Sequence, residues 1–242
     1  MIRWSMLAVL ALAAHTAYGA DASVATYAAT YRVIYKGKDA GTAEFNVRYL
    51  ADQDIYEFRS SVMAKGMLKL ARPNPAVERS QFRVDAAGVR PQGFWYEDGS
   101  RSGEDNFHID FDWQRNVATV SNAEARREFA VPEAVQDRGS LQVALMRDLA
   151  ATGAVKSFKL ADEDGVIEYE YAENGTATMP VGKGPAVATR ILTQQRVGSS
   201  RITSLWVAPS LRFLPVRMEQ RRDGEVQTAF ELISVTGLSG AQ

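Results

Sequence analysis

The sequence contains no cysteine among its 242 residues. This absence excludes disulfide bonds, thiolate chemistry and cysteine-based metal sites, so the fold must be held together by its apolar core. Basic residues are not in excess either, because 28 Lys and Arg stand against 29 Asp and Glu. A chain without a basic surplus has no electrostatic attraction for nucleic acid, and we expect no such partner.

Long apolar runs are also missing. The run Met6–Ala14 is apolar but much shorter than the about 20 residues that a helix needs to cross a bilayer. It follows Arg3, and the small residues Ala17 and Gly19 occupy both positions that a signal peptidase reads for cleavage after Gly19. We therefore predict that residues 1–19 are a cleaved signal peptide and that residues 20–242 form a single β-rich domain. The mature protein is then periplasmic and not an integral membrane protein.

Residue patterns for catalysis are sparse. There is no Gly-x-Ser-x-Gly motif, and His108 is the only histidine outside the signal segment. His108, Asp110 and Asp112 share one face of a strand and could together hold zinc, but their regular alternation with aromatic residues favours a solvated outer face. Asp162–Gly165 resembles the start of a calcium loop, lacks the later ligands, and is better explained as a hairpin turn. We predict no catalytic residue, no metal and no cofactor.

One segment breaks an otherwise strand-like pattern. In Asp137–Ala151 the apolar residues Leu141, Ala144, Leu145 and Leu149 recur at helical spacing, and Asp137 or Ser140 can cap the first turn. The spacing predicts the one convincing helix of the mature chain.

The remaining sequence alternates polar and apolar residues in short runs. Asp164-Gly165, Asn174-Gly175 and Asp223-Gly224 are strong hairpin signals between such runs. We predict a mostly β fold, a strongly curved antiparallel meander sheet or open barrel of roughly 12–14 strands around one helix. An outer-membrane barrel is the competing architecture, but charged residues interrupt any lipid-facing band and the C-terminal residue is not aromatic.

Two further segments bear on a ligand site. Met63–Leu70 is rich in methionine and could form a mobile lid over an apolar cavity, or be an ordinary strand extension. Near the C-terminus, Pro209 and Pro215 bracket a turn or bulge beside Trp206. A structural role in this turn is enough to explain these residues without a ligand. If a ligand binds, we expect it in a cavity beside the helix. Its predicted lining is Met67, Trp95, Leu145 and Trp206.

These residues also carry a resemblance. Gly41 after a Tyr-rich strand, Asp137–Ser140 at the helix start, and Trp206–Pro209 followed by Leu214–Arg217 resemble the pattern of the domain of unknown function 3108. This is a family of exported bacterial proteins, and the resemblance spans Tyr27–Thr236. It implies a shape similar to the periplasmic lipoprotein carriers, whose curved sheet shelters acyl chains, and it implies no assigned activity.

Together these patterns predict a periplasmic, non-enzymatic protein that binds an apolar or lipid-like ligand or an envelope component. Two alternatives remain open at this stage. An interaction scaffold without a small ligand predicts a filled interior. A carboxylate-dependent hydrolase predicts an acidic cleft, because paired carboxylates are its minimal machinery.

Overall fold

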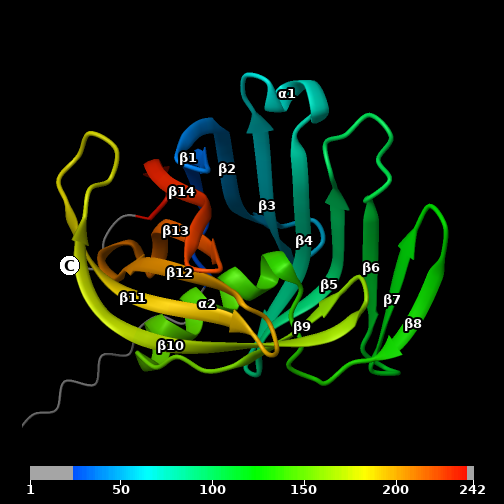
Figure 1. Ribbon diagram of the computed structural model, residues 1–242. Coiled ribbons are helices and arrows are strands. Elements are labelled where there is room, and N and C mark those ends of the chain that lie inside the picture. Colours follow the sequence, from blue (N-terminus) through cyan, green and yellow to red (C-terminus); the bar gives the residue numbers. More distant parts are fainter. Residues whose placement is uncertain (1–23, 239–242) are drawn as a thin grey trace, which may run out of the picture.

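The strands that the structure describes all belong to one antiparallel sheet (Figure 1). The computed structural model describes residues 24–238. Its fourteen strands are, in chain order, β1 (Tyr27–Tyr35), β2 (Lys38–Leu50), β3 (Ile55–Ala64), β4 (Ala76–Asp85), β5 (Gly88–Glu97), β6 (Phe107–Asp112), β7 (Val117–Asn122), β8 (Arg126–Ala130), β9 (Phe158–Asp162), β10 (Gly165–Met179), β11 (Val187–Arg196), β12 (Arg201–Ala208), β13 (Leu214–Arg222) and β14 (Glu225–Thr236). The helices are α1 (Leu68–Ala71), α2 (Arg138–Thr152) and the 3-10 turn η1 (Pro209–Leu211).

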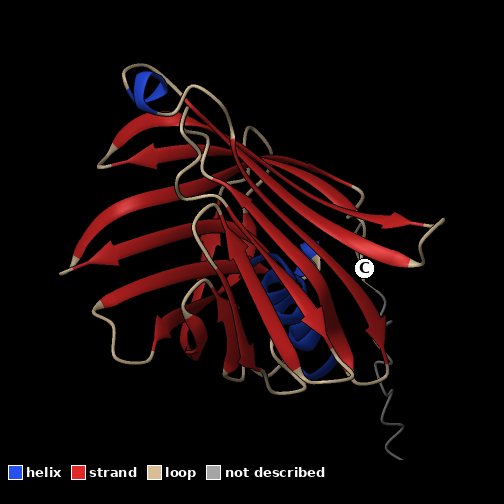
Figure 2. Cartoon of the chain, turned by 90° about the vertical axis from the view of Figure 1, so that its right-hand side faces the viewer, coloured by secondary structure: helices blue, strands red, loops and turns tan. Residues whose placement is uncertain are grey.

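The sheet is built from two meanders that meet at the chain ends. Strands β1 to β8 run outward to one edge, β9 starts at the other edge, and β14 returns to pair with β1. The chain must therefore pass from the β8 edge to the β9 edge, and α2 makes this crossing over one face. The sheet curves around that helix, which lies between the two groups of strands while α1 stands outside (Figure 2). We call the face that contacts α2 the concave face.

The start of α2 is fixed by its own sequence. Asp137 caps the helix by accepting hydrogen bonds from the backbone amides of Gly139 and Ser140, each at 2.8 Å, and the Ser140 hydroxyl accepts one from the Asp137 amide at 2.9 Å. This reciprocal capping box satisfies N–H groups that would otherwise have no partner. Gly153 in the left-handed conformation ends the helix.

The two sheet edges are brought together just before α2. The amide of Gln136 donates to the carbonyl oxygen of Lys159 at 2.9 Å, and the amide of Ala161 donates to the carbonyl oxygen of Gln136 at 2.8 Å. These bonds form a short parallel bridge between the segment that follows β8 and the free edge of β9. The sheet is thus curved almost to a barrel without being closed by a strand pair.

Two apolar clusters lie on the concave face. The larger one joins the leucines of α2 to β1–β4 and to the strands of the second meander. The smaller one lies under β5–β8 and includes Phe94, Phe107 and Ile109. Val135 and Ala161 complete it, so the joined edges also contribute to the core.

The predicted fold class is confirmed, including the strand number and the helix within one residue of its observed ends. The hairpin turn predicted at Asn174-Gly175 is wrong, because these residues form an irregularity inside the continuous strand β10. Gly175 has a φ of +94°, and glycine with a positive φ occurs in β-bulges as well as in turns. The predicted signal peptide lies outside the described residues. Within residues 24–238, no helix is long and apolar enough to span a membrane.

Candidate ligand-binding site on the concave face

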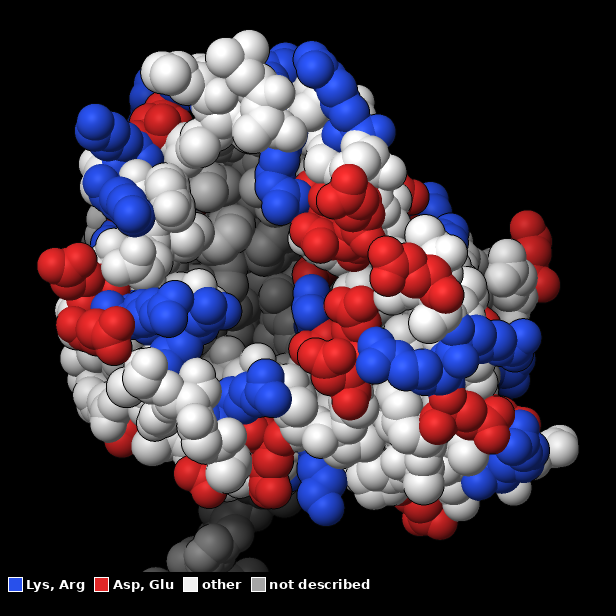
Figure 3. Space-filling model, turned by 45° about the vertical axis from the view of Figure 1, so that its right-hand side comes forward, with Lys and Arg blue, Asp and Glu red and all other residues white. Residues whose placement is uncertain are grey.

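The helix covers only part of the concave face. It lies closest to β3, β4, β5 and β9, and its buried leucines belong to the same apolar cluster as Leu192 of β11 and Leu205 of β12. Partly buried apolar side chains of β10, β13 and β14 pack against this cluster, because the strand alternation turns them inward. They are Tyr169, Tyr171, Met218 and Phe230. We call this region the concave hollow, and Figure 3 shows a depression in the molecular surface.

Strand register shows that these four side chains share the concave face. Tyr169 lies opposite the core residue Phe158, and Met218 lies between Leu205 and Phe230 across neighbouring strands. Phe230 in turn contacts Phe45 of β2, with 5.9 Å between ring centroids. An apolar row therefore runs from Leu192 on β11 through Leu205, Met218 and Phe230 to the first meander, whereas Tyr171 on β10 lies opposite the polar Gln194.

An ion cluster adjoins the hollow at the start of α2. The guanidinium of Arg138 lies 2.7 Å from Oδ1 of Asp162 and 3.6 Å from Oε1 of Glu78. The same guanidinium lies 5.5 Å from the ring centre of Tyr96. A cation in the first turn opposes the helix dipole, so its two carboxylate partners are needed to hold it there.

The charges around this cluster change the acidity of its neighbours. Burial raises the pKa of Glu78 above its ordinary value, and the charge of Arg138 opposes that rise. Burial also raises the pKa of the Tyr169 hydroxyl; Asp162 adds to the increase, whereas Arg138, Arg196 and Arg201 reduce it. Tyr169 therefore lies among charges of both signs at the border of the hollow.

The helix start is anchored to the sheet by a buried polar pair. The hydroxyl of Ser80 on β4 donates a hydrogen bond of 2.7 Å to Oδ2 of Asp137. Burial raises the pKa of Asp137 to about 7, against the opposing effect of its hydrogen bonds to Ser140, Ser80 and Gly139. The arrangement fixes the position of Arg138 relative to β4.

A second cavity lies on the other side of α2. It has a volume of about 650 Å³ and is lined by Val89, Ala144 and Phe158 together with several charged side chains, among them Asp148 and Lys156. Gln136, which is only 4% exposed, also lines it, and its side-chain oxygen has no hydrogen-bond partner. This cavity opens to solvent, so it leaves the scaffold hypothesis, which predicts a filled interior, as an open alternative.

The structure does not assemble the four residues predicted to line one cavity. Trp95 follows Phe94, which lies opposite Ser80 on the concave face, so Trp95 points to the outer face. There its ring stacks with Arg79, whose guanidinium lies 4.1 Å from the ring centre. Leu145 belongs to α2 and is 3% exposed within the core. The structure therefore does not bring Trp95 and Leu145 together on one face, and a role of either in ligand binding stays a prediction.

Trp206 and Met67 are also remote from α2. Trp206 lies opposite Arg217, on the face away from Leu205, and the guanidinium of Arg217 is 5.8 Å from its ring centre. Met67 is 85% exposed next to α1, where no residue is buried. Whether Met63–Leu70 moves as a lid stays a prediction. The physical reason for these misplacements is that strand alternation fixes which residues share a face but not which face is inward.

Residues of the hollow were not singled out in the sequence, yet two signals were present. Ile167, Tyr169 and Tyr171 alternate with Glu168 and Glu170, which is the pattern of a strand with one apolar face. Arg138 directly after a helix cap is electrostatically unfavourable and so indicates acidic partners. Neither signal identifies which distant strands would face each other.

The polar face of β6 is solvated as expected. His108 and Asp110 are 40% and 60% exposed and lie 3.2 Å apart, while Phe107, Ile109 and Phe111 are buried. Asp162–Gly165 forms the β9–β10 hairpin turn. In residues 24–238, no group of three or more His, Asp or Glu side chains has the spacing of a metal site.

Comparisons with known proteins agree with this architecture. The structure is similar to the crystal structure of a beta-barrel-like protein of the domain of unknown function DUF1849 from Brucella abortus, with a TM-score of 0.50 and 11% identity over 88% of this chain and 97% of that chain. At this identity the likeness concerns the fold alone. No match was found among curated proteins. The family model of the proteins of unknown function DUF3108 matches residues 30–229, so the chain belongs to this family.

Proposed function

We propose that the protein is a non-enzymatic, periplasmic binding protein that holds an amphipathic, lipid-like ligand in the concave hollow. The observation that carries the proposal is the partly buried apolar strip of Tyr169, Tyr171, Met218 and Phe230 on an inward-turned face. Apolar surface exposed to water is unfavourable, and a concave apolar surface is the usual form of a small-molecule site.

The chemistry of the surroundings supports an amphipathic and not a purely apolar ligand. Charged side chains border the strip, with Arg138 and Asp162 near Tyr169. Acidic and basic residues also face each other across the depression (Figure 3). A ligand with an apolar chain and a polar head group would satisfy both parts of this surface. The periplasmic location rests on the predicted signal peptide.

The cavity beside α2 is the alternative position for the same ligand. Its volume of about 650 Å³ is suitable, but much of its lining is charged, including Asp85, Asp148 and Lys156. An acyl chain bound there would displace water from these charged groups, and their desolvation costs free energy. Binding on the apolar strip does not have this desolvation cost. We therefore place the chain in the concave hollow.

The proposal is tested by calorimetric titration of the secreted protein with dodecyl maltoside and dodecyl phosphate below their micellar concentrations. We expect Tyr171→Ala and Phe230→Ala each to weaken binding about tenfold, because each removes apolar contact worth about 1.5 kcal/mol or more. Trp95→Ala, on the outer face, serves as the matched control and leaves binding unchanged. Absence of binding to the unaltered protein, or an equal loss with Trp95→Ala, contradicts the proposal.

A complementary experiment asks what the protein carries in its own compartment. Protein purified from the periplasm is extracted with organic solvent, and the extract is analysed by mass spectrometry. We expect an amphipathic molecule at a stoichiometric amount, reduced in the Phe230→Ala variant. An extract with no such molecule, combined with no shift in melting temperature on adding fatty acids or lipopeptides, counts against a carrier role.

A further inference from the structure

Three arginines stand side by side at one end of the concave hollow. Arg196 ends β11, Arg201 begins β12, and Arg222 ends β13. Arg196 lies opposite Tyr169, which faces inward, and Arg201 lies directly opposite Arg222 and has the same alternation as the buried Leu205. All three therefore project from the concave face at neighbouring positions. We call them the arginine row.

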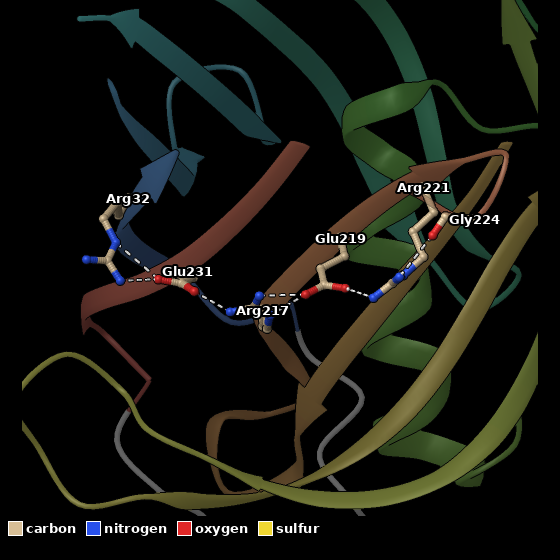
Figure 4. A network of polar contacts seen from close by, with 6 residues as sticks. All are labelled: Arg32, Arg217, Glu219, Arg221, Gly224 and Glu231. Atoms are coloured by element: carbon tan, nitrogen blue, oxygen red, sulfur yellow. Dashed lines mark hydrogen bonds and ion pairs between the residues drawn. The ribbon is translucent and has the colours of Figure 1, made fainter. Parts of the chain in front are cut away.

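Neighbouring arginines on the same strands have acidic partners, whereas the row has almost none. Arg190 on β11 pairs with Glu173, and Arg217 and Arg221 on β13 pair with Glu219 (Figure 4). Among the described residues, Arg196 and Arg201 have no carboxylate within ion-pair distance. Arg222 has only the adjacent Asp223, at 3.9 Å.

A directly opposed pair of like charges is unfavourable unless something compensates for it. The outer face contains two other opposed arginine pairs, Arg59 with Arg79 and Arg83 with Arg90. In each of them one guanidinium stacks on a tryptophan, at 4.1 Å for Arg79 and 4.6 Å for Arg90. Within residues 24–238, no aromatic ring lies under Arg201 or Arg222. Arg196 and Arg201 therefore lack both kinds of compensation found elsewhere, whereas Arg222 has Asp223 at 3.9 Å and lies opposite Glu225 of β14.

We propose that the arginine row binds the anionic head group, a phosphate or a carboxylate, of the ligand whose apolar chain lies in the hollow. This inference rests on the proposed function and specifies the ligand class. Guanidinium groups form paired hydrogen bonds with phosphate and carboxylate oxygens, and three of them side by side would surround one such group. Tyr169 connects the row to the apolar strip, since it lies opposite Arg196 and next but one to Tyr171.

The test compares two ligands with the same dodecyl chain, dodecyl phosphate and the uncharged dodecyl maltoside, on the intact mature protein. We expect the double variant Arg196→Gln/Arg201→Gln to weaken dodecyl phosphate binding at least tenfold and dodecyl maltoside binding less than threefold. Arg83→Gln is the control, because Arg83 belongs to an opposed arginine pair on the outer face. It should leave both affinities unchanged.

The remaining outcomes distinguish the two proposals. If the unaltered protein binds both ligands and the double variant binds dodecyl phosphate equally well, the head-group assignment is overturned and the binding function stands. If inorganic phosphate alone binds as tightly as dodecyl phosphate, the row is a site for a free anion and the inference is wrong. If neither dodecyl ligand binds, the proposed function fails and the assignment fails with it. The melting temperatures of the variants are measured as well. Unchanged values show that a loss of dodecyl phosphate binding is not due to impaired folding.

Discussion

The hydroxyl of Ser80 donates a 2.7 Å hydrogen bond to Oδ2 of Asp137, and this bond joins the middle of β4 to the cap of α2. Both residues have no measurable exposure. The bond fixes the start of the helix over the sheet, and hence the position of the Arg138 cluster. Its energetic weight and its dependence on pH can both be measured.

Replacement of the cap should destabilise the protein strongly. Asp137→Ala removes three accepted hydrogen bonds and leaves the Ser80 hydroxyl buried without a partner. Loss of the cap costs about 1 kcal/mol, and the unpaired buried hydroxyl adds about 1–3 kcal/mol. We expect a decrease of about 2–4 kcal/mol in the free energy of unfolding, measured by urea titration. Asp52→Ala in an exposed turn is the control, and equal effects of both variants would refute the anchoring role.

The same carboxyl predicts a pH dependence of stability. Because burial raises the pKa of Asp137 to about 7, the folded state binds this proton more tightly than the unfolded state does. Its contribution to stability is fully present below the ordinary aspartate pKa and is lost as the pH rises through about 7. We expect Asp137→Asn to reduce the fall in unfolding free energy between pH 5 and pH 8. An identical fall in the variant and the unaltered protein would show that this carboxyl does not titrate in that range.

Gly139 allows the close approach of α2 to the sheet. A Cβ at this position would lie 2.7 Å from Cδ1 of Phe58 and 2.7 Å from Cβ of Ser80. Gly139→Ala should therefore destabilise the protein by about 1–3 kcal/mol, although alanine favours a helix by about 1 kcal/mol in open surroundings. Thermal unfolding measures this effect. Ala151→Gly, at an exposed position of α2, gives the reference for helix propensity alone. If Gly139→Ala stabilises the protein, Phe58 and Ser80 can move to make room for the added Cβ, and the expectation is wrong.

The sequence predicts the local parts of this architecture better than the distant ones. The cap at Asp137 and the turn at Asp223-Gly224 depend on neighbours in the chain, and both are found where expected. Phe94 and Trp95 show the limit, because one of two adjacent residues must face outward and only the packing of α2 decides which. The arginine row depends on the pairing of β12 with β13 and on the direction of sheet curvature. Neither is encoded in a short pattern.

The outer face carries an ion network across the joint between the two meanders (Figure 4). Arg217 on β13 pairs with Glu219 and with Glu231 on β14, and Glu231 also pairs with Arg32 on β1. Glu219 has a side chain only 8% exposed, so the loss of Arg217 would remove one of its two arginine partners and leave Arg221 at 2.7 Å.

We expect Arg217→Ala to lower the free energy of unfolding by about 2 kcal/mol, less than for a fully buried pair because Arg217 is partly exposed. Urea unfolding at low and high salt measures the effect. Arg126→Ala, at an exposed position of β8, is the control. An effect of Arg217→Ala no larger than that of the control would mean that the network does not stabilise the β1–β14–β13 joint.

The exposed apolar residues beside α1 should contribute nothing to folding. Met67 and Leu70 are 85% and 73% exposed, so replacing both with serine removes almost no buried surface. We expect the free energy of unfolding to change by less than about 0.5 kcal/mol. A larger loss would show that the segment packs on the protein in solution. With stability unchanged, the rate of dodecyl phosphate release separates the two interpretations of Met63–Leu70, because a lid that covers the ligand must slow its escape and a simple surface loop cannot.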